Sequence, residues 1–292
     1  MFQELKQSFK EGSYLTRLLY INVGVFVVVN LLIAIFTLTN VSTYWVSYLE
    51  VPASFHTFVV QPWSIITYMF LHTGFIHLLF NVLALYWFGK FFLTYYNQKQ
   101  LTSLYFLGGL TGALVYMVGY NVFPYFKPVI DNSYLLGASA SVMAILFAPV
   151  VTEPDREIHL TFIGNIKLKY LGLIFLLIDL LGVGATNAGG SMAHLGGAVA
   201  GCLFALIIKK NGVDICTPIN KIIGFFANMR LNKPKMKVKS KREFTDAEWN
   251  EYNHKKKQDR NARVDEILEK IKKSGYENLT PEEKKELFEI SK

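Results

Sequence analysis

The chain has 292 residues, of which 52% are hydrophobic, and a mean hydropathy of +0.28, which excludes an ordinary soluble protein. The net charge is +8, but 21 of the 30 Lys and Arg residues lie between Lys209 and Lys292, so the basic character belongs to the C-terminal part. We expect that part to lie beside an anionic membrane surface, with no nucleic-acid partner.

Six apolar stretches are long enough, or nearly so, to cross a bilayer, which requires roughly 20 helical residues. The hydropathy pattern predicts spans over residues 18–39, 75–95, 101–123, 136–151, 168–183 and 192–208. The fourth and fifth spans are short and the sixth is rich in small residues, which is typical of central helices wrapped by others. We therefore expect an all-α polytopic membrane protein: a six-helix transmembrane bundle with short central helices.

Polarity divides the chain into four regions: an N-terminus (1–17), a membrane domain (18–210), an amphipathic and basic linker (211–242) and a soluble helical tail (243–292). Within the linker, residues 218–230 are expected to form a short helix on the membrane surface. The tail pattern predicts a helical hairpin over 264–291, with Gly275 ending the first helix. Thr280-Pro281-Glu282-Glu283 predicts the start of the second, because a cap residue precedes proline and a glutamate follows three residues later.

The distribution of Lys and Arg predicts the orientation of the spans. Segments on one side carry these residues repeatedly, whereas the loops on the other side (40–74, 121–136 and 184–191) carry only Lys127. The positive-inside rule then places both termini in the cytoplasm. The start of the fourth span lies toward the outer face, and the uncharged, aromatic loop 40–74 is expected to lie in the membrane interface.

Ser139 lies near the start of the fourth span, between Ala138 and Ala140 and two residues after Gly137. Small neighbours leave a serine hydroxyl accessible and let other helices come close. This setting indicates Ser139 as a nucleophile. Ser141, two residues later, is a second hydroxyl and remains an alternative.

His194 begins a row of small residues on the sixth span, with Gly197 and Gly201 below it on the same helix face. A Gly-x-x-x-Gly pair lets a neighbouring helix approach at backbone distance. If this row meets the small residues of the fourth span, His194 can accept the Ser139 proton and return it to a leaving amine. The fourth and sixth spans hold no acid to orient the imidazole, so a dyad is favoured over a triad. Asp179, on the fifth span, is interpreted as a packing or pore-mouth residue, with a catalytic part as the less favoured alternative.

His77 and Asn81 are four residues apart on the second span and present their polar groups on one helix face. Hydrogen-bond donors that converge from an apolar helix suit the oxyanion that develops in acyl transfer. His72 lies five residues before His77, where we expect a structural or water-handling role. Burying an ionisable group in a membrane span costs free energy, so His72, His77 and His194 are each candidate functional residues. Taken alone, each is equally consistent with a packed structural histidine.

Four pieces of the chain, together covering roughly residues 15–210, resemble the rhomboid intramembrane serine proteases. They are the first-loop tryptophan (Trp63), the His-x-x-x-x-His-x-x-x-Asn pattern (His72, His77, Asn81), the Gly-x-Ser motif (Gly137-Ala138-Ser139) and the histidine helix (Ala193-His194-Leu195-Gly196-Gly197, with Gly201). Each motif alone is weak, whereas the four together are highly specific.

The resemblance implies a serine endopeptidase that cleaves transmembrane segments of membrane proteins, with Ser139 as nucleophile and His194 as general base and acid. The Ser139 backbone amide, His77 and Asn81 form the expected oxyanion hole. Supporting roles fall to Gly137, His72, Trp63, Met143, Gly197 and Gly201. The substrate helix must unwind locally, and water must reach the serine from the outer face, held there by Thr67 and His72.

The resemblance also implies a location. We expect an integral protein of the bacterial plasma (inner) membrane whose active site opens to the outer face. The expected partners are transmembrane protein substrates and the lipid bilayer, with neither a metal nor a cofactor. Nothing in the sequence indicates what the tail binds.

Three positions depart from the family pattern. Ala140 replaces the usual glycine after the serine, so its methyl could narrow the site near the amide. Ser64 follows Trp63, where arginine is common. Met143 stands where many relatives have an aromatic ring stacked on the histidine, and it can still pack against imidazole.

Two other functions compete with proteolysis. One is a catalytically inert rhomboid-like protein that binds transmembrane helices, although such relatives typically lose the serine or the histidine. The other is a zinc-binding membrane protein or transporter that uses His72, His77 and His194. The chain has no His-Glu-x-x-His pair and no intramembrane acid near these histidines in sequence, which disfavours the metal site.

Overall fold

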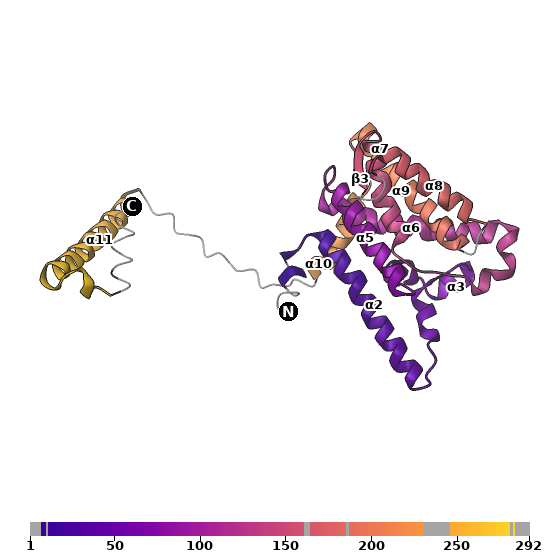
Figure 1. Ribbon diagram of the computed structural model, residues 1–292, viewed down its shortest axis with the longest axis horizontal. Helices are drawn as coiled ribbons and strands as arrows, with labels where there is room; N and C mark the ends of the chain where they lie inside the picture. Colours follow the sequence, from indigo (N-terminus) through magenta and orange to yellow (C-terminus); the bar gives the residue numbers. More distant parts are fainter. Residues whose placement is uncertain are drawn as a thin grey trace. The chain divides into compact units, whose positions relative to one another are not determined.

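The computed structural model describes residues 7–9, 11–160, 164–184, 187–229, 246–280 and 283. The chain divides into two compact units, residues 1–231 and 232–292. Six long helices dominate the first unit (Figure 1). They are α2 (Tyr14–Leu38), α5 (Phe75–Phe92), α6 (Gln98–Val122), α7 (Ser139–Thr152), α8 (Leu168–Gly182) and α9 (Ala188–Asn211). Each coincides, apart from a few residues at its ends, with one of the predicted spans.

Four of these helices, α2, α5, α6 and α9, are long and apolar enough to cross a membrane. The other two are shorter, with 14 residues in α7 and 15 in α8. Large apolar side chains such as Val28 and Ile35 of α2 and Leu181 of α8 stay exposed. Such apolar surfaces are typical of helices that face lipid, because in water they would promote aggregation. The prediction that the fifth span is a central helix is therefore wrong, because most of α8 faces away from the bundle.

Helix α7 lies at the centre of the bundle, and every residue from Ala140 to Pro149 is buried. Glycines on both sides bring its neighbours to backbone distance. A Cβ atom built on Gly197 or Gly201 of α9 would lie under 3.0 Å from the carbonyl oxygen of Ala140 or Ala144, respectively. The predicted contact between the glycine row and the fourth span is therefore confirmed. The contact runs along Ala140 and Ala144.

Helix α8 packs against α7 and α9 through a second apolar cluster. Phe147, Leu171 and Ala198 are buried in it, with Leu176 partly buried beside them. Gly172 lets α8 approach α7, because a Cβ atom there would lie 2.9 Å from a methyl carbon of Val150. These contacts hold the first half of α8 against the second half of α7.

The segment between α2 and α5 is more ordered than a simple loop. It contains η1 (Tyr44–Leu49), β1 (Val51–Pro52), α3 (Phe55–Val60), α4 (Ser64–Thr67) and η2 (Tyr68–Phe70). Strand β1 pairs antiparallel with β2 (Tyr134–Leu135), with Val51 opposite Leu135. The indole N–H of Trp63 donates to the Tyr48 carbonyl at 2.8 Å, which closes the segment on itself. This region is therefore attached to the strand that leads into α7.

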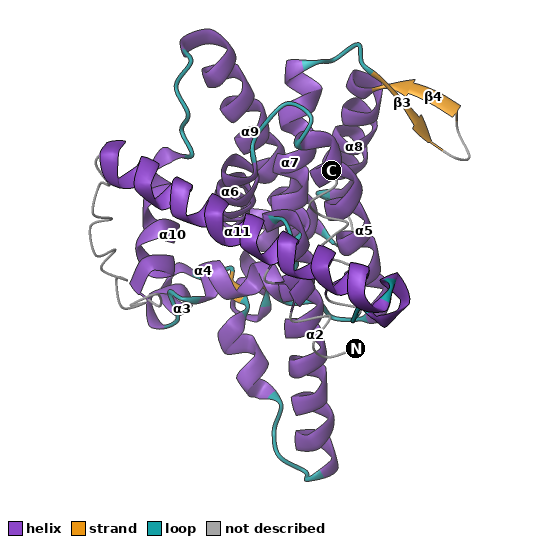
Figure 2. Cartoon of the chain, turned by 90° about the vertical axis from the view of Figure 1, so that its left-hand side faces the viewer, coloured by secondary structure: helices purple, strands orange, loops and turns teal. Residues whose placement is uncertain are grey.

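The remaining connections of the first unit are short. A 3-10 helix, η3 (Pro124–Asn132), leads from α6 to β2. The antiparallel strands β3 (Glu157–Leu160) and β4 (Gly164–Lys167) form a hairpin that joins α7 to α8. Figure 2 shows this hairpin projecting beside α8. After Gly212 ends α9 in the left-handed conformation, α10 (Thr217–Met229) follows at the place of the predicted amphipathic helix. Ser103 of α6 donates to Asn220 at 2.7 Å and holds α10 against the bundle.

The second unit contains α11 (Asp246–Ser274) and η4 (Tyr276–Asn278). Helix α11 begins well before the residue 264 expected for the first helix of the hairpin, and it ends at Gly275, as predicted. The expected cap is present, since the Thr280 amide donates to Glu283 Oε2 at 2.7 Å and the Glu283 amide donates to Thr280 Oγ1 at 3.2 Å. The basic linker 231–242 and the body of the second helix lie outside the described residues.

Candidate active site

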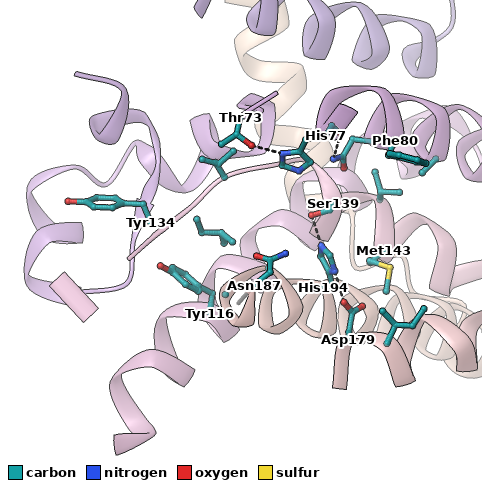
Figure 3. A pocket seen from close by; sticks show the side chains of 18 of the residues that line it. Thr73, His77, Phe80, Tyr116, Tyr134, Ser139, Met143, Asp179, Asn187 and His194 are labelled. Carbon is teal, nitrogen blue, oxygen red and sulfur yellow. Dashed lines mark hydrogen bonds and ion pairs between the residues drawn. The ribbon is translucent and has the colours of Figure 1, made fainter. Parts of the chain in front are cut away.

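A cavity of about 820 Å³ opens where the starts of α5, α7 and α9 meet the end of α8. Its wall includes five residues that the sequence singles out: Ser139, His194, His77, Asn81 and Met143. Figure 3 shows Ser139 between the two histidines, with Asp179 behind His194. The structure thus brings together side chains from four helices that are far apart in the chain.

Ser139 is the first residue of α7, and its hydroxyl oxygen lies 2.7 Å from Nε2 of His194. This distance is that of a good hydrogen bond, short enough for direct proton transfer. Helix α7 starts here because Gly137, two residues earlier, has φ +124°, a backbone conformation that residues other than glycine rarely adopt. The amide of Gly137 donates to the Tyr68 carbonyl at 2.9 Å, which fixes the turn.

Asp179 contacts the other nitrogen of the same imidazole. Its Oδ1 lies 2.7 Å from Nδ1 of His194, and its side chain is only 7% exposed. An acid from the fifth span therefore does contact His194, although the sequence placed none in the fourth or sixth span. This contact favours the catalytic alternative for Asp179 over the packing or pore-mouth interpretation. The sequence does hold a signal, because an acid within an apolar span usually faces a partner inside the bundle.

His77 faces Ser139 from the opposite wall. A Cβ atom built on Gly137 would lie 3.1 Å from Nε2 of His77 and 3.8 Å from Oγ of Ser139, so the glycine leaves room for the ring. The hydroxyl of Thr73 lies 3.3 Å from Nδ1 of His77. If this hydroxyl donates, the ring proton stays on Nε2, which can then donate into the cavity. Sequence reasoning missed Thr73, although it precedes His77 by one helical turn.

Asn81 lines the cavity one turn beyond His77. Its side-chain amide donates one hydrogen bond to the His77 carbonyl at 2.9 Å, which orients the group. An amide carries two N–H bonds, so the second can serve a ligand in the cavity. Both expected oxyanion donors therefore lie on the cavity wall, together with the Ser139 amide at the N-terminus of α7, where the first amides have no intrahelical acceptor.

Ala140 does not narrow the cavity. The residue is buried, and its methyl carbon points toward α6, where a Cβ atom built on Gly112 would lie under 3.0 Å from it. The glycine that the family motif usually has after the serine is compensated here by a glycine on the facing helix. Ser141 is completely buried and does not line the cavity, which disfavours it as the nucleophile.

The remaining predicted residues lie around the cavity instead of on its wall. Gly197 and Gly201 hold α9 against α7, as described above. His72 is buried beside His77, with ring centroids 5.1 Å apart, and neither of its nitrogens has a partner within the described part of the chain. Trp63 closes the segment before α5. The Thr67 hydroxyl donates to the Leu49 carbonyl at 2.6 Å, which leaves it no second proton for water.

Comparisons with known proteins agree with this architecture. Residues 60–211, slightly more than half of the chain, match the Rhomboid domain, and residues 250–292 match a family of unknown function (DUF6576). The chain is 28% identical over 157 residues to RHOMBOID-like protein 12, mitochondrial, of Arabidopsis thaliana, which covers 50% of this chain and 46% of the relative. It is 30% identical over 174 residues to Rhomboid-related protein 1 of Caenorhabditis elegans, and this match covers 56% of this chain and 44% of the relative.

The chain spans about half the length of these curated relatives. The match to the Rhomboid domain contains every element that lines the cavity, from α5 to α9. With its long apolar helices, the protein is an integral membrane protein, and the chain belongs to the rhomboid family.

Proposed function

We propose that this protein is an intramembrane serine endopeptidase that cleaves transmembrane segments of other membrane proteins. The observation that carries the proposal is the 2.7 Å separation between Ser139 Oγ and His194 Nε2 on the wall of a cavity inside the apolar bundle. A serine hydroxyl is a weak nucleophile until a neighbouring base accepts its proton. The imidazole of His194 is in position to do so.

In the acylation step, Ser139 Oγ attacks the carbonyl carbon of the scissile peptide bond while its proton moves to His194 Nε2. The carbonyl oxygen becomes an oxyanion, which the His77 and Asn81 side chains and the Ser139 amide can stabilise by donating hydrogen bonds. As the C–N bond breaks, His194 gives its proton to the leaving amine. The acyl group then remains on Ser139 as an ester.

Deacylation repeats these roles with water as the nucleophile. His194 accepts a proton from water as the oxygen attacks the ester carbon, and it returns the proton to Ser139 Oγ as the ester bond breaks. The products are a carboxylic acid and the free enzyme. Water must therefore reach the cavity, which is consistent with its polar lining by Asn81, Asn132 and Asn187.

The membrane setting defines the substrate class. We propose six spans, with the short helices α7 and α8 crossing beside the four long ones, both termini in the cytoplasm and a site open to the outer face of a bacterial inner membrane. A substrate that enters from lipid is a helix, and its peptide bonds are shielded by the neighbouring turns. It must unwind locally before a carbonyl carbon can reach Ser139.

A fluorophosphonate probe tests the reactive serine without a known substrate. The probe is attacked by an activated hydroxyl, so that an O–P bond forms, the P–F bond breaks and fluoride leaves. We expect labelling of the full chain in detergent and in Ser141→Ala, and none in Ser139→Ala or His194→Ala. Equal labelling of wild type and Ser139→Ala would contradict the proposal. Absence of labelling in the folded wild type would favour an inert binder of transmembrane helices.

A metal-dependent function is tested in the same assay. No group of three or more His, Cys, Asp or Glu side chains that could hold a metal ion occurs among the described residues. We therefore expect labelling to be unaffected by a chelator. Loss of labelling on chelation, restored by zinc, would instead support a metal site at the histidines.

A further inference from the structure

We propose that Asp179 is a positioning residue for His194, so that this chain works with a Ser-His-Asp arrangement in which three different transmembrane helices supply one residue each. The proposal rests on the proposed function and extends it. Ser139 is on α7, His194 on α9 and Asp179 on α8, and the two contacts of the imidazole are both 2.7 Å long. Figure 3 shows the three side chains in one line.

The contact between Asp179 and His194 decides which ring nitrogen carries the proton. An ionised carboxylate only accepts hydrogen bonds, so the proton of the neutral imidazole lies on Nδ1. Nε2 then holds the lone pair that accepts the Ser139 proton. When His194 becomes positively charged in the transition state, the adjacent carboxylate stabilises it, and this effect is large where water is excluded.

His77 provides a useful contrast on the opposite wall of the cavity. Its Nδ1 faces the hydroxyl of Thr73, which can donate as well as accept, whereas Nδ1 of His194 faces a carboxylate. When the Thr73 hydroxyl donates, the two rings have opposite tautomers, with Nε2 a donor on His77 and an acceptor on His194. One side of the cavity suits an oxyanion and the other suits the serine proton.

A purely structural role explains Asp179 poorly. The residue lies in the last turn of α8, which ends at Gly182, and a negative charge there is unfavourable because the helix dipole is negative at that end. Its second oxygen, Oδ2, is buried without a hydrogen-bond partner within the described part of the chain. A residue retained for stability would not leave a buried acceptor unpaired.

The position of Asp179 is also held by packing of α8 that does not involve the carboxylate. One turn earlier on α8, Leu176 packs with the cluster formed by Phe147 and Ala198, and the contact of Gly172 with Val150 brings α8 close to α7. The backbone of α8 is therefore held independently of the carboxylate. This separation makes it possible to test the carboxylate and the packing with different variants.

The other titratable groups that face this cluster are few. His77 approaches from α5 with His72 beside it, and three tyrosines line the same cavity: Tyr116, Tyr120 and Tyr134. Among the described residues that line the cavity, Asp179 is the acid that contacts His194, so its removal leaves the imidazole without a neighbouring anion there. Among the described lining residues, no second carboxylate can replace it.

The test compares wild type with four variants of the full chain, purified in detergent, in cleavage of a transmembrane reporter. The variants are Asp179→Asn, Asp179→Ala, Leu176→Ala and Ser139→Ala. We expect Asp179→Asn to lower kcat by roughly 10²- to 10⁴-fold with little change in KM, as for the acid in other serine proteases. Asp179→Ala should lose as much, and added formate should restore part of its kcat by supplying a small carboxylate in the vacated space. Leu176→Ala removes one packing contact of α8, while Leu171 and the contact between Gly172 and Val150 still hold the helix against α7. Its stability should fall, its kcat should stay near wild type, and formate should have no effect.

The outcomes separate this inference from the proposed function. If wild type cleaves, Ser139→Ala does not and Asp179→Asn cleaves at the wild-type rate, the positioning role is wrong and a Ser-His dyad suffices. If Leu176→Ala loses as much kcat as Asp179→Ala and formate restores neither, Asp179 acts through packing and the inference fails. If wild type and Ser139→Ala cleave equally, the proposed function fails, and the inference with it.

Discussion

Gly197 on α9 faces the carbonyl oxygen of Ala140 on α7 so closely that no side chain fits between the two backbones. Ala140 follows the serine, and Gly197 lies one turn below His194 on the same helix. The contact therefore sets the separation of the two helices at the level where Ser139 and His194 meet. Packing and chemistry depend on the same few glycines.

Substituting Gly197 tests this relationship. We expect Gly197→Ala to push α9 away from α7, with a loss of about 3 kcal/mol or more in stability, at the upper end of overpacked cores. Activity should fall even under conditions where the variant is fully folded, because the Ser139–His194 distance grows. Thermal unfolding and reporter cleavage measure the two effects.

Gly24 offers the matched control, since it also lies within a helix and a Cβ atom there would meet nothing within 4 Å. Gly24→Ala should keep wild-type activity and unfold at the same or a slightly higher temperature, because alanine favours helix. Equal losses in Gly24→Ala and Gly197→Ala would contradict the role given to the close contact.

Gly137 combines a strained backbone with a close approach to His77. We expect Gly137→Ala to cost roughly 1–3 kcal/mol in stability for its positive φ and to lower kcat as well, because the new methyl must displace the His77 ring. Gly212→Ala is the control, since Gly212 also has positive φ (+65°) but open space around it. That variant should lose stability and keep kcat, and a parallel fall in kcat would show that backbone strain alone explains the Gly137 result.

Asn81 tests the oxyanion hole. Asn81→Ala should lower kcat by roughly 10²- to 10³-fold, the effect of removing one donor, while fluorophosphonate labelling continues more slowly. Thr73→Val should also lower kcat if the Thr73 hydroxyl donates to Nδ1 of His77, because the ring then loses the contact that keeps its proton on Nε2. Both are measured with the transmembrane reporter, and an Asn81→Ala variant with wild-type kcat would remove Asn81 from the site.

The ionisation of Glu283 should make the stability of the tail depend on pH. The hydrogen bond from Lys270, followed by that from the Thr280 amide, lowers the pKa of Glu283 to about 2. Because the pKa is lower when folded, the carboxylate contributes stability above its ordinary pKa, and this contribution is lost as the pH falls toward 2. In ¹³C spectra of the full chain in detergent, assigned with Glu283→Gln, the carboxyl signal should titrate near pH 2. A midpoint above 4 would contradict the cap.

The sequence predicted the helices and the meeting of Ser139 with His194 because both rest on simple patterns. Long apolar runs locate the spans, and the spacing of His194, Gly197 and Gly201 identifies the face of α9 that must meet another helix. On helix α8, Asp179 indicates a face that points into the bundle, but the sequence does not identify its partner. The helix is apolar on nearly every face, so the rotation that turns Asp179 toward His194 becomes known only once α7 and α9 are packed.

Two further features depend on contacts between distant segments. The region before α5 has no regular periodicity, so its short helices and its pairing of Val51 with Leu135 could not be predicted from pattern. The doubt raised by Ala140 could not be resolved from the motif either, because the direction of its methyl group depends on Gly112 of α6. In both cases the missing information lies in the partner segment.

Cleavage of a transmembrane reporter by the full chain in proteoliposomes tests the central claim most directly. We predict that wild type and Ser141→Ala cleave the reporter within its membrane segment, as located by mass spectrometry, and that Ser139→Ala does not. Cleavage by Ser139→Ala at the wild-type rate would contradict the assignment of Ser139 as the nucleophile. So would a folded Ser141→Ala variant that has lost both reporter cleavage and probe labelling.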